Sequence, residues 1–336
     1  MHPRHPRQVR VPANPAQAPI IVLAFNRPDY LAETLESLMC QQGVDIRARR
    51  VFLFQDGGHN NASGVTYCSD AIIAGNIELF HRIVPHGIPL PAYENLGIAL
   101  NFDRAERFAF DELKANAAVF LEDDLVLGKY YLATLDRLLG LALTNDRVGY
   151  VAAYGNHTAP IAMQLGQPSR LFPLGHNWAF GLTRRQWLRQ RPYVEQYLAI
   201  VRGQDYLLRD HDRIIDLFHA WGFGAPGSSQ DIAKSHACIL TGAARVNTYA
   251  CYGRYIGRRG VHFSDEIFES LGFGKADIVE EDLFQMAAPS EVELLDCIAQ
   301  ARHAAQIDLL RKCNADARAG DRQAAAALDR LKPAET

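Results

Sequence analysis

Short apolar segments alternate with segments of helical periodicity through the first 150 residues of this 336-residue chain. The apolar segments are rich in β-branched and aromatic residues, as buried strands are, and they cover residues 20–25, 51–55, 76–84 and 118–121. Strands that are joined through helices pair in parallel. The alternation therefore predicts an α/β fold with a mostly parallel central sheet, helices on both faces, and ligand sites at the carboxyl ends of the strands.

The second half of the chain continues with less regular spacing. Further strands are predicted at 148–153, 178–182 and 245–250, with Thr183 as a suitable N-cap for the helix that follows the second of them. Helices are predicted at 129–143, about 206–220, 228–239 and beyond 289. Residues 156–175 and 253–264 lack periodicity and are predicted to be long loops, which in compact domains are often functional.

Charge and cysteine usage exclude several function classes. The 35 basic and 38 acidic side chains nearly balance, so the chain lacks the broad basic surface of a nucleic-acid-binding protein. Six scattered cysteines without a C-x-x-C pair indicate a reducing compartment and no structural zinc. No apolar run of about 18 residues or more occurs, so a cytoplasmic protein is expected, in which Arg4, Arg7 and Arg10 could contact an anionic membrane peripherally.

Three consecutive acids, Glu122, Asp123 and Asp124, follow the predicted strand at 118–121. Mg²⁺ and Mn²⁺ prefer carboxylate oxygens and commonly share their shell with substrate phosphates. The triplet therefore indicates a divalent-cation site, although a solvated turn or the start of a helix would accept the same residues.

Five segments in order carry a resemblance to a known family. AFNRPDYLAETLESL, FLFQDGGHNN, ENLGIALNFDRA, VFLEDDL and LFPLGHNWAFGLTRRQW are similar to segments of the GT-A glycosyltransferases, and most closely of the N-acetylglucosaminyltransferase I family. The resemblance covers residues 19–273. It implies a nucleotide-sugar-binding α/β sandwich, with a flexible leader at 1–18, a glycosyltransferase domain at 19–275 and a helical C-terminal extension at 276–336.

The resemblance assigns roles to the acids and to two further residues. Asp124 matches the family's direct metal ligand for Mn²⁺ (or Mg²⁺), and Glu122 and Asp123 match acids that contact the ribose and support the metal site. Arg27 matches an arginine on the donor diphosphate, which a guanidinium fork suits, and its alternative is a surface cation. Asp56 matches a carboxylate that accepts from uracil, and its alternative is an ordinary Asp-Gly turn.

Two further residues are implied to bind the donor. Asn101 stands where the family has a uracil-contacting histidine, so this contact is altered or replaced by an amide contact, and the alternative is a mid-helix polar residue that faces solvent. Trp178 is expected to pack near the sugar or the acceptor, although a tryptophan in a core is the usual case.

The basic loop at 253–264 resembles a family loop that closes over the donor. Arg258 and Arg259 could meet phosphate there, and His262 could meet phosphate or metal, so that the loop orders over an anionic ligand and excludes water. A solvated basic loop is the alternative.

Inverting transfer to a hydroxyl needs one general base, for which Asp231 is the candidate. It precedes a predicted helix at a distance from Arg245 that resembles the family's spacing, and its alternative is an acid at a helix N-terminus. Asp205 and Asp212 are the other acids within reach.

These observations predict an inverting, metal-dependent glycosyltransferase. It would move a sugar, with GlcNAc expected, from a UDP-sugar to a hydroxyl of a glycan, lipid-linked or protein acceptor. A nucleotide-sugar-forming nucleotidyltransferase and a non-catalytic carbohydrate-binding protein of the same fold are the alternatives.

Overall fold

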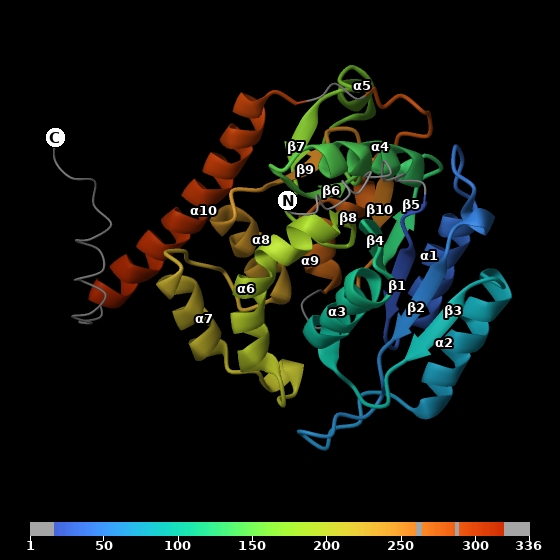
Figure 1. The fold of residues 1–336 in the computed structure, drawn as a ribbon, viewed down its shortest axis with the longest axis horizontal. Helices are drawn as coiled ribbons and strands as arrows, with labels where there is room; N and C mark the ends of the chain where they lie inside the picture. Colours follow the sequence, from blue (N-terminus) through green and yellow to red (C-terminus); the bar gives the residue numbers. More distant parts are fainter. Residues whose placement is uncertain (1–16, 260–263, 286–288, 319–336) are drawn as a thin grey trace, which may run out of the picture.

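The computed structural model describes residues 17–259, 264–285 and 289–318 (Figure 1). Within them, eight strands form one central sheet: β1 (Ile20–Ala24), β2 (Val51–Gln55), β3 (Ile88–Pro91), β4 (Ala117–Glu122), β6 (Val148–Ala152), β7 (Leu171–Pro173), β8 (Ala179–Thr183) and β9 (Ala244–Thr248). Their order across the sheet is β3-β2-β1-β4-β8-β6-β9-β7. A separate antiparallel pair consists of β5 (Leu125–Leu127) and β10 (Gly253–Tyr255).

Most of the central sheet is parallel. β1 pairs in parallel with β2 and β4, β2 with β3, and β6 with β9. β8 runs antiparallel to both β4 and β6, and the edge strand β7 runs antiparallel to β9. The α/β architecture predicted from the alternation of strands and helices is confirmed.

Helices cover both faces of the sheet (Figure 1). α1 (Pro28–Met39), α2 (Asp70–Ile83) and α4 (Tyr131–Thr144) pack with Ile20 and Val22 of β1 on one face. α3 (Gly97–Arg107), its π-helical continuation Phe108–Glu112, α6 (Arg184–Val201) and α8 (Gln230–Leu240) pack with Ile21 and Leu23 on the other. Because successive β1 side chains enter opposite cores, all five of its residues are apolar and buried.

The predicted third strand at 76–84 is wrong, because these residues form the C-terminal half of α2. The buried residues Asn76, Leu79 and Phe80 have the spacing of one helical face, and a short, largely apolar segment is compatible with either structure. The strand on the side of β2 away from β1 is instead β3, a few residues later.

The predicted long loop at 156–175 is also partly wrong. It contains the short helix α5 (Ile161–Leu165) and the edge strand β7. Gln164, fully buried in α5, donates from Nε2 to the Ala159 carbonyl and accepts from the Cys251 N–H at 2.7 Å. The contact with Cys251 joins α5 to a segment that is distant in sequence, and local periodicity carries no sign of such a contact.

The helices predicted at 228–239 and beyond 289 are present as α8 and α10 (Glu291–Arg318), whereas the helix predicted at about 206–220 begins only at His211, after a separate 3-10 turn at Tyr206–Leu208. α7 (His211–Ala220) precedes α8, α9 (Asp265–Ser270) follows β10, and α10 lies beside α8 (Figure 1). The Gly224 N–H donates to the Ala305 carbonyl of α10 at 2.8 Å. A Cβ on Gly224 would lie 2.1 Å from the Leu309 nitrogen, so this approach requires glycine. Across the described ranges, none of the helices combines the length and the apolar character that crossing a bilayer requires.

Candidate active site

The order of the strands reverses at β1. β2 and β3 extend the sheet on one side of β1, whereas β4 adds to its other side. In open α/β sheets, the carboxyl ends of the two strands at such a switch point flank the usual ligand crevice. Here the loop after β1 carries Arg27, and β4 ends at Glu122, followed directly by Asp123 and Asp124.

Arg27 forms ion pairs with two of the three acids. Its Nη2 contacts Asp123 Oδ1, and its Nη1 lies 2.9 Å from Asp124 Oδ2. Both carboxylates are buried, whereas the arginine side chain is 25% exposed. The guanidinium therefore closes the acids off from solvent and neutralises part of their charge.

The carboxyl groups of the triplet repel one another in a poorly hydrated environment. Burial, partly offset by Arg27, raises the pKa of Asp124 to about 6. Loss of hydration and then the charges of Asp124 and Asp231 raise the pKa of Glu122 well above its ordinary value. The site thus holds more negative charge than Arg27 alone balances.

Two carboxylate oxygens of the triplet fit a divalent cation. Asp123 Oδ2 and Asp124 Oδ1 are buried and have no hydrogen-bond partner among the described residues. Within the same ranges, no group of three or more His, Cys, Asp or Glu side chains is arranged to hold a metal by itself. A cation on these oxygens would complete its shell with water and substrate phosphate, which is how Mg²⁺ and related ions usually bind.

The start of the basic loop lies against the same acids. The Ile256 N–H donates to the Asp124 carbonyl at 2.9 Å. A Cβ on Gly257 would lie 2.3 Å from Tyr255 Oη and 2.8 Å from Asp124 Oδ2. The loop backbone therefore contributes to the wall around Asp124, and only glycine fits there without displacement.

Arg259 connects this loop to the start of α1. Its guanidinium pairs with Asp29, its N–H donates to Tyr30 Oη at 3.1 Å, and its carbonyl accepts from Arg27 Nη1 at 3.3 Å. Arg258 pairs with Glu269 of α9 at 2.7 Å. Both arginines expected to meet phosphate are thus paired with protein carboxylates in this structure, and His262 lies outside the described residues.

Trp178 lies in an aromatic cluster beside the acids. His176 stacks on its indole at 4.4 Å between centroids and Tyr255 at 4.0 Å. Two nearly parallel rings at these separations do not fit on one face, so both faces of the indole are covered by protein rings. The Trp178 carbonyl accepts from the Glu122 N–H at 2.7 Å, which holds the aromatic cluster at the end of β4, and a position of Trp178 near the sugar or the acceptor stays a prediction.

Asp56 is saturated by donors of the protein. Its Oδ1 accepts from the Gly57 and Leu96 N–H groups at 2.9 and 2.8 Å, and its Oδ2 accepts from the Gly97 N–H and Asn95 Nδ2 at 3.0 and 3.2 Å. Four donors fill the accepting capacity of a carboxylate. The expected contact with uracil is therefore not available here, and Asp56 holds the β2 turn and the start of α3.

Asn101 is likewise occupied within the fold. Its Nδ2 donates to the Phe54 carbonyl at 3.1 Å and its Oδ1 accepts from Arg104 at 3.3 Å. The side chain is buried between α3 and β2, so it neither faces solvent nor offers its amide to a base edge. Both uracil assignments thus fall on residues that stabilise this part of the sheet.

Asp231 lies in the first turn of α8, after the N-cap Ser229. Its Oδ1 accepts from Asn177 Nδ2 at 2.9 Å and from Gln230 Nε2. Asn177 Oδ1 in turn accepts from Arg245 Nη2 at 2.5 Å. The sequence analysis identified Asp231 and its spacing to Arg245, but it gave Asn177 no role. The one sequence signal for Asn177 is its position in the GHNW segment, beside Trp178.

The two other acids considered for the same role have different surroundings. Asp205 accepts from Ser63 Oγ at 2.5 Å, Tyr67 Oη at 2.6 Å and the Leu207 N–H at 3.0 Å, so it ties the loop after β2 to the chain after α6. Asp212 is exposed in the first turn of α7. Asp231 is the acid whose charge acts on Glu122.

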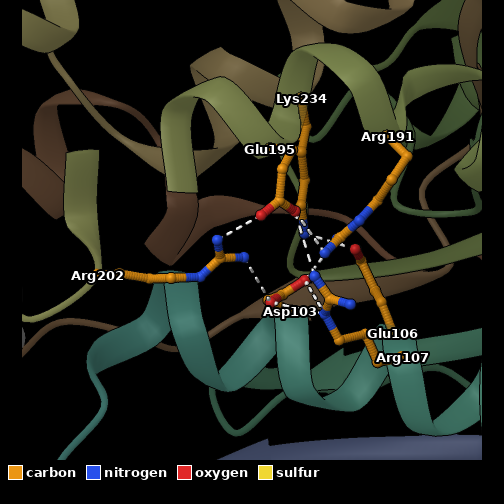
Figure 2. A network of polar contacts seen from close by, with 7 residues as sticks. All are labelled: Asp103, Glu106, Arg107, Arg191, Glu195, Arg202 and Lys234. Carbon is orange, nitrogen blue, oxygen red and sulfur yellow. Dashed lines mark hydrogen bonds and ion pairs between the residues drawn. The ribbon is translucent and has the colours of Figure 1, made fainter. Parts of the chain in front are cut away.

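A buried ion pair anchors α8 on α3 (Figure 2). Lys234 Nζ lies 2.6 Å from Glu106 Oε1, and the two side chains are 4% and 2% exposed. Lys234 is on the same helix as Asp231, so the pair fixes the helix that presents it. The surrounding network consists of Asp103, Arg107, Arg191, Glu195 and Arg202.

No protein-family model matches this sequence. No curated protein sequence matches it either.

Similar solved structures include residues 1–349 of TarS from S. aureus in complex with UDP-GlcNAc, with 13% identity, a TM-score of 0.43, and coverage of 85% of this chain and 72% of that chain. Another is GalNAc-T7 with UDP, GalNAc and Mn²⁺, with 9% identity, a TM-score of 0.46, and coverage of 74% of this chain and 45% of that chain. Likenesses of this degree leave the function to be argued from the site itself.

Proposed function

We propose that this protein is a glycosyltransferase that transfers a sugar from a UDP-sugar to a hydroxyl acceptor with inversion. One observation carries the proposal: Arg27 pairs with the acids that follow β4 at the switch point of the sheet, and the adjacent residues Asn177 and Trp178 contact Asp231 and Glu122. The groups come from distant parts of the chain. Cationic and carboxylate groups together suit a diphosphate, a divalent cation and a reacting hydroxyl.

The donor end of the site would stabilise the departing diphosphate. A Mn²⁺ or Mg²⁺ ion held by Asp124 and Asp123 would supply positive charge to the leaving group when bound. Arg27 would bind phosphate oxygens through its guanidinium fork, which suits them in shape and charge. The loop residue Gly257 would keep the wall beside Asp124 close to the bound group.

The acceptor end would use Asp231 as general base. Its carboxylate takes the proton of the acceptor hydroxyl while the hydroxyl oxygen bonds to the anomeric carbon. The bond from that carbon to the diphosphate breaks, and its electron pair leaves with UDP. A positioned base of this kind typically contributes about 10²–10⁴-fold to the rate.

The identity of the donor rests on the sequence resemblance. A UDP-sugar, with GlcNAc as the expected sugar, remains the proposal, but recognition of uracil would have to use groups other than Asp56 and Asn101. A glycan, lipid-linked or protein acceptor is proposed on the same resemblance. A peripheral position at the cytoplasmic face of a membrane is a prediction from the sequence, and the arginines that it rests on, Arg4, Arg7 and Arg10, lie outside the described residues.

The two alternatives are less well supported. A nucleotidyltransferase would need a glycine-rich phosphate loop directly after β1, where this chain has Phe25, Asn26 and Arg27. A non-catalytic carbohydrate-binding protein would have no need for poorly hydrated acids with unpartnered oxygens beside an arginine.

Calorimetric titration with UDP-GlcNAc and UDP, with and without Mn²⁺, tests the proposal. We expect binding that requires Mn²⁺ and that is lost in Asp124→Asn. Asp212→Asn, which changes an exposed acid on α7, is the matched control and should bind like the wild type. Binding to Asp124→Asn that is as tight as to the wild type would contradict the proposed cation site.

A further inference from the structure

We infer that Asn177 is a positioning residue, which fixes the carboxylate of Asp231 in the orientation that leaves one oxygen for the acceptor proton. The inference rests on the proposed function of Asp231 as the base. It concerns a buried amide for which neither the sequence patterns nor the family resemblance gives a role.

The orientation of the Asn177 amide is determined by its neighbours. Asn177 is fully buried, and its Oδ1 accepts from Arg245 Nη2 at 2.5 Å. Because a guanidinium only donates, the amide oxygen must face Arg245, and the amide nitrogen then faces Asp231. The Nδ2 group donates to Asp231 Oδ1 at 2.9 Å.

The same contacts distinguish the two oxygens of Asp231. Oδ1 accepts from both Asn177 and Gln230, whereas Oδ2 has no hydrogen-bond donor among the described residues. Asp231 itself is only partly buried. One oxygen is therefore held by the protein, and the other is left to accept the proton of an acceptor hydroxyl.

Asn177 also connects the base to the acidic end of the site. The next residue, Trp178, accepts from the Glu122 N–H at 2.7 Å through its carbonyl. The preceding residue, His176, accepts from Arg245 at 3.0 Å in the same way. One short segment thus determines where Asp231 lies relative to the end of β4, and displacement of a reacting group by about 1 Å can cost about a hundredfold in rate.

Two substitutions separate a positioning role from a merely structural one. Asn177→Asp keeps an oxygen for Arg245 but replaces the amide donor with an oxygen that repels Asp231, whereas Asn177→Ala removes both contacts. A structural role predicts that Asn177→Asp is the milder change, because its ion pair with Arg245 preserves the packing. A positioning role predicts that Asn177→Asp is at least as damaging to turnover.

The variants are compared in three measurements on the full chain: the unfolding midpoint, Mn²⁺-dependent binding of UDP, and release of UDP from UDP-GlcNAc with water as the acceptor. We expect unchanged UDP affinity and turnover that is about ten- to a hundredfold lower in both Asn177 variants. Gln186→Ala is the control, because Gln186 is an equally buried amide that donates to the Asp146 carbonyl in the connection between α4 and β6. It should lose stability but not turnover.

Three outcomes would overturn the inference. Wild-type turnover in Asn177→Asp, with an inactive Asp231→Asn, would reject the role of Asn177 and leave the proposed function standing. Full turnover in Asp231→Asn would instead reject the base on which the inference rests. Strictly additive unfolding midpoints for Asn177→Ala, Asp231→Ala and the double variant would exclude the contact, whichever donor the enzyme uses.

Discussion

Nη1 of Arg27 lies 2.9 Å from Oδ2 of Asp124, so a protein cation contacts one of the carboxylates that a divalent metal would need. The same guanidinium contacts Asp123 and, through a hydrogen bond to the Arg259 carbonyl, the loop that follows β10. Arg27 thus links the start of α1, the acids of β4 and the basic loop.

Removal of this guanidinium should change metal binding and nucleotide binding in opposite directions. In Arg27→Met, Mn²⁺ no longer competes with a bound cation, so calorimetry on the nucleotide-free protein should detect affinity about tenfold higher or more. UDP in the presence of Mn²⁺ should bind more weakly, because a phosphate ligand is lost. Arg213→Met, which removes an exposed arginine of α7 that pairs with Asp210, is the control. Equal losses in both titrations would contradict this account.

The buried pair of Lys234 and Glu106 should be costly to break on one side. Lys234→Met leaves Glu106 charged and unpaired in the core, and should lower the free energy of unfolding by about 3–5 kcal/mol in urea denaturation. The double variant Lys234→Met with Glu106→Leu should recover most of the loss, since no buried charge remains. Lys129→Met removes a pair with Glu280 whose side chains are each 52% exposed, and should leave the free energy of unfolding almost unchanged.

His176 should make the protein sensitive to acid. Burial, and then the charges of Arg245 and His157, lower the pKa of His176 from 6.5 to about 3. Between these pH values the folded protein therefore binds fewer protons than the unfolded chain. The free energy of unfolding is thus highest above pH 6.5, as far as His176 is concerned, and decreases as the pH falls toward 3. By about pH 5 the loss amounts to roughly 2 kcal/mol.

His176→Phe should remove that part of the pH dependence. Neither ring nitrogen of His176 has a hydrogen-bond partner in the described part of the chain, so phenylalanine preserves the stacking on Trp178. The difference in unfolding free energy between about pH 7.5 and about pH 5 should be roughly 2 kcal/mol smaller than in the wild type. The exposed His303→Phe should leave it unchanged. An unaltered difference in His176→Phe would show that His176 is protonated without cost.

Gly257→Ala should damage the cation site more than the fold. The new Cβ would meet Tyr255 Oη and Asp124 Oδ2 at 2.3 and 2.8 Å, so either the loop or the carboxylate must move. We expect Mn²⁺-dependent UDP binding to weaken about tenfold or more, with a small change in the unfolding midpoint. Gly175→Ala, whose Cβ would have no atom within 4 Å, is the matched control. Equal UDP affinity in both variants would exclude a role of this loop in the site.

The sequence alone determined the strands and helices with strong local patterns. β1, β2 and β4 lie within one or two residues of their predicted positions, because continuous apolar runs are favourable only where both faces are buried. Thr183 caps α6 by accepting from the Gln186 N–H at 3.3 Å, as a local signal predicts. The end of β4 likewise carries the acidic triplet at the edge of the sheet where the strand pattern predicted it.

The tertiary structure decided which polar groups are free and which are used by the fold. Asp56 obtains three of its four donors from residues 39 to 41 positions away, and Asn177 lies 54 residues from Asp231. A side chain's hydrogen-bonding capacity depends on partners that are remote in sequence, so a motif cannot reveal whether that capacity is already filled. For this reason the sequence could identify Asp56 and Asp231 as candidates, but it could not tell them apart. Only the folded chain shows that four donors fill the carboxylate of Asp56, whereas one oxygen of Asp231 accepts no hydrogen bond from the described residues.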